Sequence, residues 1–313
     1  MSINISLKKS LNVKSVKNHV FFTNKDFRIN EINKLPIFKF SNFINKSISS
    51  SVLDDKNFLS YDINAFQKIT LIRIKNSQSP LEIEKIGAEF YTYLKTNSYF
   101  KTSFYEQNLR STFPKNKFFF DQFTQGLHLK SYEFNKYKSK SKEKKFEIEI
   151  FNRNKSFQFN KKSKYKSLIE GTNFTKDLVS EPGNILHPDE YAKRLLKLRK
   201  FGLKVNIYDD KKLKKLGMNA LLGVGQGSVR GSYLVTLEWK GAKTKKKPLA
   251  FVGKGVCFDT GGISLKPAKF MEDMTYDMAG SAVVVGLMKN LALRKAKVNA
   301  VGVVGLVENM PGS

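Results

Sequence analysis

The stretch VGKGVCFDTGGISLKPAKFMEDMTYDMAG, residues 252–280, joins the end of an apolar strand to a cluster of glycines and charged side chains. Four of its ionisable residues are the candidates for chemistry: Lys254, Asp259, Lys266 and Asp277. Ligands of open α/β sheets bind at the carboxyl ends of the strands. Because charged groups are costly to bury alone, we expect these four side chains to meet partners at such a strand end.

The sequence around this stretch alternates strands with helices. From Ser167 on it predicts helices from Ser167 through Asp177 and from Pro188 to about Arg199, a short helix ending near Gly217, and a helix at 278–293. It predicts strands at 204–208, 233–239, 249–256 and 298–307, and a Gly-rich stretch at 222–228 precedes the second of these strands. Several of these strands are apolar on both faces, which is typical of a parallel sheet buried between helices. We therefore expect residues 167–313 to form a three-layer α/β/α domain with a mixed, mostly parallel sheet.

The first half of the chain is rich in Lys, Asn, Ser and Phe, and its structural signals are shorter. Residues 68–75 and 145–151 have the pattern of strands, and residues 81–94 that of a helix. They predict a small N-terminal α/β domain over residues 1–155. Residues 156–166 are polar and basic with little periodicity, so they predict a linker between the two domains.

The chain carries 56 Lys and Arg against 27 Asp and Glu, a formal charge of +29, and the excess occurs in both halves. Either a general bias toward Lys, Asn, Phe and Ile or a surface that binds nucleic acid would produce it. The single cysteine, Cys257, excludes an internal disulfide and fits a reducing compartment. No apolar run reaches the roughly 18 residues of a membrane span. We expect a soluble cytoplasmic protein with no membrane partner.

Lys254 stands in the predicted strand between two glycines. It is either a solvated lysine of an edge strand or a shielded amine, which needs a carboxylate partner or loses its proton and can then bind a metal. Asp259 follows five residues later, an odd offset that places it on the opposite face unless the strand has ended. Gly261 and Gly262 suggest that it has, and a turn there would let Lys254 and Asp259 converge.

Asp277 precedes a helix that is apolar almost all round, so it is either the N-cap of that helix or a ligand at its buried start. Two aspartates and an amine suit a divalent ion such as Mn²⁺ or Zn²⁺, although they leave it short of donors. Lys266 would be a flexible cation beside the metal, where it can stabilise a developing oxyanion.

These residues resemble the leucyl aminopeptidases, the cytosolic M17 metallopeptidases. The runs VGKG-VCFDTGGISLKP and MEDMTYDMAGSAVV carry the resemblance, with support from Val179–Asn184, Leu221–Ser228 and Val307–Pro311. The resemblance covers roughly residues 168–313. It implies that Asp259 bridges two divalent metals, that Lys254 and Asp277 bind one of them, and that Lys266 polarises the scissile carbonyl. These four residues and Met274 would contact the substrate, an alternative for Met274 being ordinary core. Thr275 stands where the family often has a basic residue.

The family further implies peptide substrates with a free N-terminus, a homohexamer and a bicarbonate ion that assists proton transfer. The Asn-Thr-Asp-Ala-Glu-Gly-Arg segment that supplies its remaining ligands does not occur in these 313 residues. We therefore expect an incomplete catalytic domain, a fragment inactive alone, within a metal-dependent aminopeptidase. Two alternatives remain open: a basic nucleic-acid-binding or regulatory protein on a peptidase scaffold, and a non-catalytic structural subunit. The three histidines, His19, His128 and His187, are isolated, and His187 is most simply a surface or capping residue.

Overall fold

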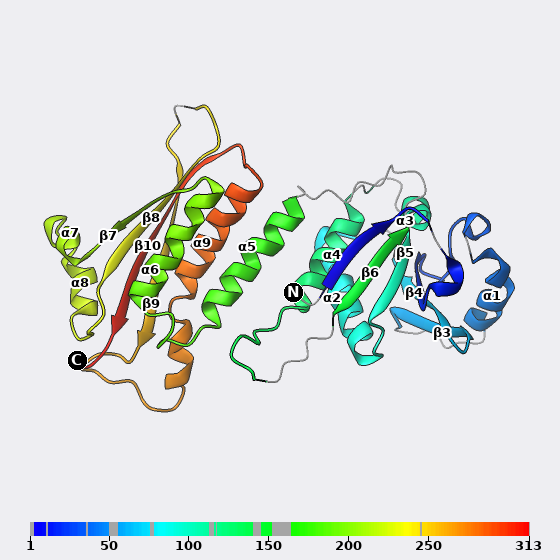
Figure 1. Cartoon of the computed structure of the whole chain (residues 1–313), viewed down its shortest axis with the longest axis horizontal. Helices are drawn as coiled ribbons and strands as arrows, with labels where there is room; N and C mark the ends of the chain where they lie inside the picture. The colour runs from blue at the N-terminus through cyan, green and yellow to red at the C-terminus, as the bar shows by residue number, and fades with distance from the viewer. Residues whose placement is uncertain are drawn as a thin grey trace. The chain divides into compact units, whose positions relative to one another are not determined.

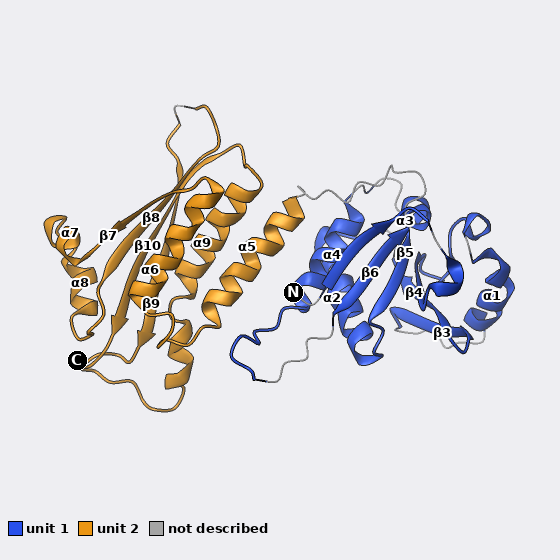
Figure 2. Ribbon diagram, viewed as in Figure 1, with its two compact units in different colours: residues 1–161 blue, residues 162–313 orange. Residues whose placement is uncertain are grey.

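The computed structural model describes residues 3–10, 12–35, 37–49, 56–75, 78–112, 116, 118–139, 145–151, 164–244 and 246–312. The chain divides into two compact units, residues 1–161 and residues 162–313 (Figure 2). Most of the expected linker, residues 156–163, lies outside the described residues. Within the ranges given above, no helix is both long enough and apolar enough to cross a membrane.

Unit 1 is built on a six-stranded sheet in the order β1-β6-β5-β2-β4-β3 (Figure 1). The elements are β1 Ile3–Lys8, β2 Asn18–Thr23, α1 Ser41–Ser49, β3 Phe58–Asn64, β4 Gln67–Arg73, α2 Pro80–Thr96, β5 Lys101–Tyr105, α3 Glu106–Thr112, α4 Phe119–Lys130 and β6 Phe146–Phe151, with short 3-10 turns at Val13–Ser15, Ile32–Lys34 and Phe38–Phe40. All neighbouring strands are parallel except β3, which runs antiparallel to β4.

Two apolar cores cover the two faces of this sheet. Phe22 of β2 belongs to the core under α2 and α4, whereas the adjacent Phe21 belongs to the core under α1. This alternation follows from the two-residue period of a strand. The predicted strands at 68–75 and 145–151 correspond to β4 and β6, and the predicted helix at 81–94 corresponds to α2.

Unit 2 is built on a four-stranded sheet in the order β7-β8-β10-β9 (Figure 1). Its elements are α5 Lys164–Val179, α6 Pro188–Leu196, the 3-10 turn η4 Lys197–Phe201, β7 Lys204–Tyr208, α7 Asp210–Lys215, α8 Asn219–Gly225, β8 Tyr233–Lys240, β9 Leu249–Asp259, the 3-10 turn η5 Met271–Tyr276, α9 Ala279–Leu293 and β10 Asn299–Asn309. The Gly-rich stretch at 222–228 is thus partly helical, as α8, which the sequence analysis did not predict.

The sheet of unit 2 is mixed, as expected, but among its described strands only β9 and β10 pair in parallel. The predominance of parallel pairs is found in unit 1 instead. Apolar residues on both faces of a strand indicate helices on both sides and do not determine strand direction. Buried β10 residues such as Val304 face the core formed with α9 and α6, whereas Gly305 lies against Leu221 of α8 on the other face.

Candidate active site

The start of helix α9 packs directly on the backbone of strand β9. A side chain at Gly253 would place its Cβ 2.6 Å from the carbonyl oxygen of Gly280 and 2.7 Å from the Cα of Ser281. Both of those are backbone atoms, so no side-chain movement could relieve the contact. This close approach explains the glycine beside Lys254, and it brings the carboxyl end of β9 next to the residues that lead into α9.

Lys254 and Asp277 meet across this contact, with 2.9 Å between Lys254 Nζ and Asp277 Oδ1. The side chain of Lys254 is 60% exposed, so of the two alternatives for Lys254 the structure shows the solvated lysine of an edge strand. The physical reason is that β9 is the outer strand of the described sheet. The carboxylate partner that the sequence analysis required for Lys254 is nevertheless present.

Asp259 reaches the same place by a change of register. From Val256 to Asp259, strand β9 advances three residues while the paired strand β10 advances two, from Val307 to Asn309. One extra residue in a strand reverses the alternation of its side chains, as in a β-bulge. The offset of five residues therefore no longer places the side chains of Lys254 and Asp259 on opposite faces of the strand. The sequence analysis expected the strand to end before Asp259, and instead it continues with an irregularity.

The loop after β9 turns Lys266 back onto Asp259. Gly261 and Gly262 have φ angles of +92° and +70°, a region in which residues with a side chain are strained. The amide of Lys266 donates to the carbonyl oxygen of Thr260 at 2.9 Å, which closes the loop. Lys266 Nζ then lies 2.8 Å from Asp259 Oδ2 and 2.9 Å from the sulfur of Met274.

Hydrogen bonds hold Asp259 in its ionised form. Burial raises the pKa of this carboxyl, but hydrogen bonds from Lys266, the Gly261 amide and Asn309 outweigh burial and lower the pKa to about 2. Asn309 Nδ2 donates to Asp259 Oδ1 at 2.7 Å. The sequence analysis did not single out Asn309. It noted the run of residues 307–311 only as a turn, and the parallel pairing of β9 with β10 is what places Asn309 beside Asp259.

Asp277 is not a helix cap. Helix α9 has Met278 at its N-cap position and no side-chain cap hydrogen bond. Asp277 Oδ2 is buried and has no hydrogen-bond donor among the described residues, while the Asp277 carboxyl lies within hydrogen-bond distance of the carboxyl of Asp259. A buried carboxylate oxygen without a donor is costly, and a cation beside it would satisfy it.

The supporting motifs also come together. Ser228, after α8, donates to Glu308 of β10 at 2.6 Å, and a Cβ at Gly227 would collide with the carbonyl oxygen of Met310. The Gly-rich stretch and the turn after β10 are therefore neighbours. His187 has the capping role expected of it, because its ring accepts from the Glu190 amide at the start of α6.

The comparison of sequences decides the family of this unit. Residues 173–313 match the catalytic domain of the cytosol aminopeptidase family. Residues 173–313 belong to that family. A probable cytosol aminopeptidase of Phytoplasma australiense is 53% identical over 193 residues, which are 61% of this chain and 39% of that protein. One of Caulobacter vibrioides is 61% identical over 146 residues, 46% of this chain and 30% of that protein. The chain thus spans less than half the length of the curated relatives it matches.

Solved structures show the same fold across the chain. A mutant of tomato leucine aminopeptidase superposes with a TM-score of 0.74 at 24% identity, covering 99% of this chain and 64% of the tomato chain. At this level of identity the likeness concerns the fold alone. The fold of each unit is therefore similar to that of the corresponding part of the tomato protein.

The aminopeptidase unit offers a divalent metal two aspartates and one amine. Among the residues described, no group of three or more His, Cys, Asp and Glu side chains is close enough to hold a metal ion. The donors that are present fit one nonetheless, because Asp277 Oδ2 is buried without a partner and Asp259 is ionised beside it. Carboxylate oxygens are ligands that Mn²⁺ accepts readily, and a neutral lysine amine can complete such a set.

Proposed function

We propose that the protein is a metal-dependent leucyl aminopeptidase, a hydrolase that removes N-terminal residues from peptides. The observation that carries the proposal is the convergence of Lys254, Asp259, Lys266 and Asp277 at the carboxyl end of β9, with one buried carboxylate oxygen unpartnered. Membership of residues 173–313 in the cytosol aminopeptidase family supports the same reaction.

In this proposal Asp259, Asp277 and Lys254 would hold the divalent metal ions. Manganese is supported by a bottromycin maturation enzyme of the same fold that was solved in complex with Mn, with a TM-score of 0.71 at 20% identity over 96% of this chain and 61% of that chain. Zinc is the alternative metal. Two such ions, when bound, supply Lewis-acid activation of water and of the scissile carbonyl.

The ammonium groups of Lys254 and Lys266 now balance the two carboxylates in pairs. Lys254 can serve as a ligand only as a neutral amine, so it must give up its proton when it leaves the ion pair with Asp277. Lys266 keeps its charge. Once its contact with Asp259 is released, it can donate to the carbonyl oxygen of the substrate and stabilise the tetrahedral oxyanion.

In this proposal Met274 contacts the substrate side chain. It lies on η5, in which no residue is fully buried, and its sulfur touches Lys266 Nζ. Its surroundings therefore differ from those of an ordinary core methionine. The wider expectations of a homohexamer, a bicarbonate ion and a cytoplasmic location belong to the proposal through the family resemblance.

The test uses the product of the whole reading frame, assayed on leucine p-nitroanilide with Mn²⁺ and after treatment with EDTA. We expect hydrolysis that depends on the metal. Asp259→Asn should abolish activity and lower the bound metal measured by mass spectrometry. Lys266→Ala should keep the metal and lower kcat by on the order of 10²–10³.

Lys269→Ala is the matched control, because Lys269 is exposed on the same loop and makes no ion pair with any described residue. Its kcat should match that of the unaltered protein. Loss of metal from the Lys266 variant would contradict the division of roles. Metal-independent hydrolysis, or none at all, would reject the proposed activity and favour a binding role on a peptidase scaffold.

A further inference from the structure

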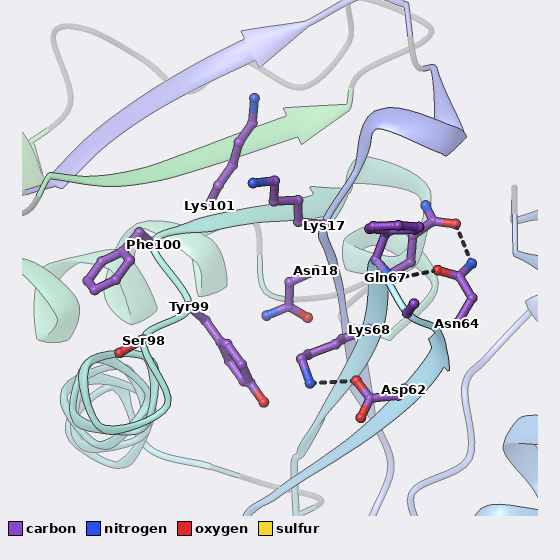
Figure 3. A pocket seen from close by; sticks show the side chains of 12 residues that line it. Lys17, Asn18, Asp62, Asn64, Gln67, Lys68, Ser98, Tyr99, Phe100 and Lys101 are labelled. Atoms are coloured by element: carbon purple, nitrogen blue, oxygen red, sulfur yellow. Dashed lines mark hydrogen bonds and ion pairs between the residues drawn. The ribbon is translucent and has the colours of Figure 1, made fainter.

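Unit 1 contains a cavity of about 500 Å³ that lies far along the chain from the metal-binding residues. It opens where β2, β4 and β5 begin and β3 ends, and Figure 3 shows the side chains around it. Ligands of α/β sheets usually bind at the opposite, carboxyl edge. The fold therefore gives no reason to expect a binding site here, and only the side chains that line the cavity indicate one. The volume lies within the range of small-molecule sites.

The lining carries a positive excess. Lys17, Lys68 and Lys101 line the cavity with a single acidic residue, Asp62. Lys68 is paired with Asp62, and Lys101 lies 3.3 Å from Glu149 of the neighbouring strand β6. Lys17 makes no ion pair with any residue that the structure describes. An anion in the cavity would therefore meet at least one ammonium group that no described carboxylate neutralises.

A buried amide also lacks a partner at this site. Asn18, which is only 2% exposed, points into the space between Lys68 and Tyr99 (Figure 3). Its Oδ1 accepts from Thr70 Oγ1 at 2.8 Å. Thr70 is hydrogen-bonded in turn to Ser60, which accepts from Tyr93. This chain of hydroxyls holds the amide in place and leaves its Nδ2 group without an acceptor.

An unsatisfied buried N–H group costs stability, and an acceptor supplied by a ligand would recover that cost. Phosphate oxygens are strong acceptors and bind both ammonium and amide donors. Phe66, which also lines the cavity, is 85% exposed and offers an aromatic face to a planar ring. The ring of Tyr99 is half-buried and already lies under Lys68 Nζ, which is 5.5 Å from its centroid. Lysines, an oriented amide and one exposed aromatic ring together match a phosphate group with or without an attached base.

We propose that this cavity binds a phosphate group, either as free phosphate or as the phosphate of a nucleoside monophosphate. Lys17 supplies the unpaired charge and Asn18 Nδ2 the oriented hydrogen bond. Asn18 Nδ2 has less than 1 Å² of accessible surface, so the proposal requires a lining side chain to turn aside when the ligand enters. The site lies wholly within unit 1, so it does not depend on the proposed peptidase activity.

The experiment titrates the whole chain with AMP and, separately, with inorganic phosphate by calorimetry in 0.15 M salt, and follows the Asn18 side-chain amide by ¹⁵N NMR. We expect saturable binding at one site and a shift of the Asn18 amide signals. Lys17→Gln should weaken binding about tenfold. Lys25→Gln is the matched control, because Lys25 is an exposed lysine of the same unit without an ion pair among the described residues.

A second variant, Asn18→Asp, keeps an acceptor for Thr70 but replaces the donor with a carboxylate, and should abolish binding in a chain whose circular dichroism is unchanged. Equal affinity for both probes would identify free phosphate, and tighter binding of AMP would identify a nucleotide. Binding that does not saturate, or that falls equally in the Lys17 and Lys25 variants, would reflect only the net charge of +29 and overturn the proposal. So would the absence of binding.

Discussion

The two oxygens of the Asp277 carboxyl have different surroundings. One oxygen pairs with Lys254, whose side chain is largely exposed, and the other is buried without a donor near the ionised Asp259. An exposed ion pair contributes little to the free energy of folding. The pair with Lys254 therefore offsets only part of the cost of burying the second oxygen of Asp277 without a donor. Such a conflict is typical of a functional site, where a bound cation resolves what the protein alone leaves unsatisfied.

The substitution Asp277→Asn tests whether a bound cation relieves the cost of the unpartnered oxygen. Removing the charge should leave the metal-free protein as stable as the unaltered one or more stable by up to about 1 kcal/mol. It should also abolish the rise in thermal midpoint that Mn²⁺ produces in the unaltered protein. The measurement is thermal unfolding followed by the fluorescence of Trp239, the single tryptophan, with and without Mn²⁺.

Asp273→Asn provides the control, since Asp273 stands on η5 near Asp277 and makes no ion pair with a described residue. It should keep the full response to Mn²⁺. Strong destabilisation of the metal-free Asp277 variant would show that its ion pair with Lys254 outweighs the cost of the unpartnered oxygen.

The sequence predicted which four ionisable residues of the run 252–280 belong together, because their spacing resembles that of the leucyl aminopeptidases, whereas Lys269, Glu272 and Asp273 of the same run have no place in that pattern. It did not predict Asn309. Nothing in the spacing connects position 309 with position 259, and only the parallel pairing of β9 with β10 brings the amide to the carboxylate.

At the scale of elements, the contact between β9 and α9 positions the whole site. It depends on backbone atoms meeting without side chains between them, since the position of a Cβ at Gly253 is already filled by Gly280 and Ser281. Separating the two elements by the width of a methyl group would move Lys254 away from Asp277. The packing of one helix on one strand thus controls the geometry of the ion pairs.

Gly253→Ala should destabilise unit 2 by at least about 2 kcal/mol, because backbone cannot move aside as a side chain can. Urea unfolding followed by Trp239 fluorescence measures this. Gly223→Ala is the control: Gly223 lies in α8, and a Cβ there would meet nothing within 4 Å. In a helix this change should leave stability unchanged or raise it by about 0.5–1 kcal/mol. Equal effects of the two substitutions would refute the close-approach argument.

At the scale of the molecule, two histidines of unit 1 couple its stability to pH. His19 is fully buried and His128 is half-buried. Burial lowers the pKa of both side chains from 6.5 to about 4. The stability of unit 1 should therefore depend on pH in mild acid.

A histidine with a lowered pKa binds its proton more weakly in the folded protein than in the unfolded chain. The stability of unit 1 should thus be complete above pH 6.5 and fall as the pH approaches 4, by roughly 3 kcal/mol for each histidine. Denaturant unfolding followed by circular dichroism between pH 7 and pH 4 measures the loss. His128→Gln should reduce the slope of the free energy of unfolding against pH by an amount that corresponds to the uptake of about one proton. An unchanged slope would refute the contribution assigned to His128.

Hydrophobic periodicity and the chemistry of a short motif were sufficient to predict an α/β fold, a second domain in the latter half of the chain and four residues that converge in it. These features are local, because the spacing of apolar residues and the turn residues between elements can be recognised within a short stretch of sequence. The tertiary structure decided the rest: antiparallel β8, the irregularity that turns Asp259 toward Asp277, the exposure of Lys254, and the cavity of unit 1. Each depends on which strands become neighbours and in what register, and strand pairing between residues far apart in the chain leaves no periodic signal in either strand alone.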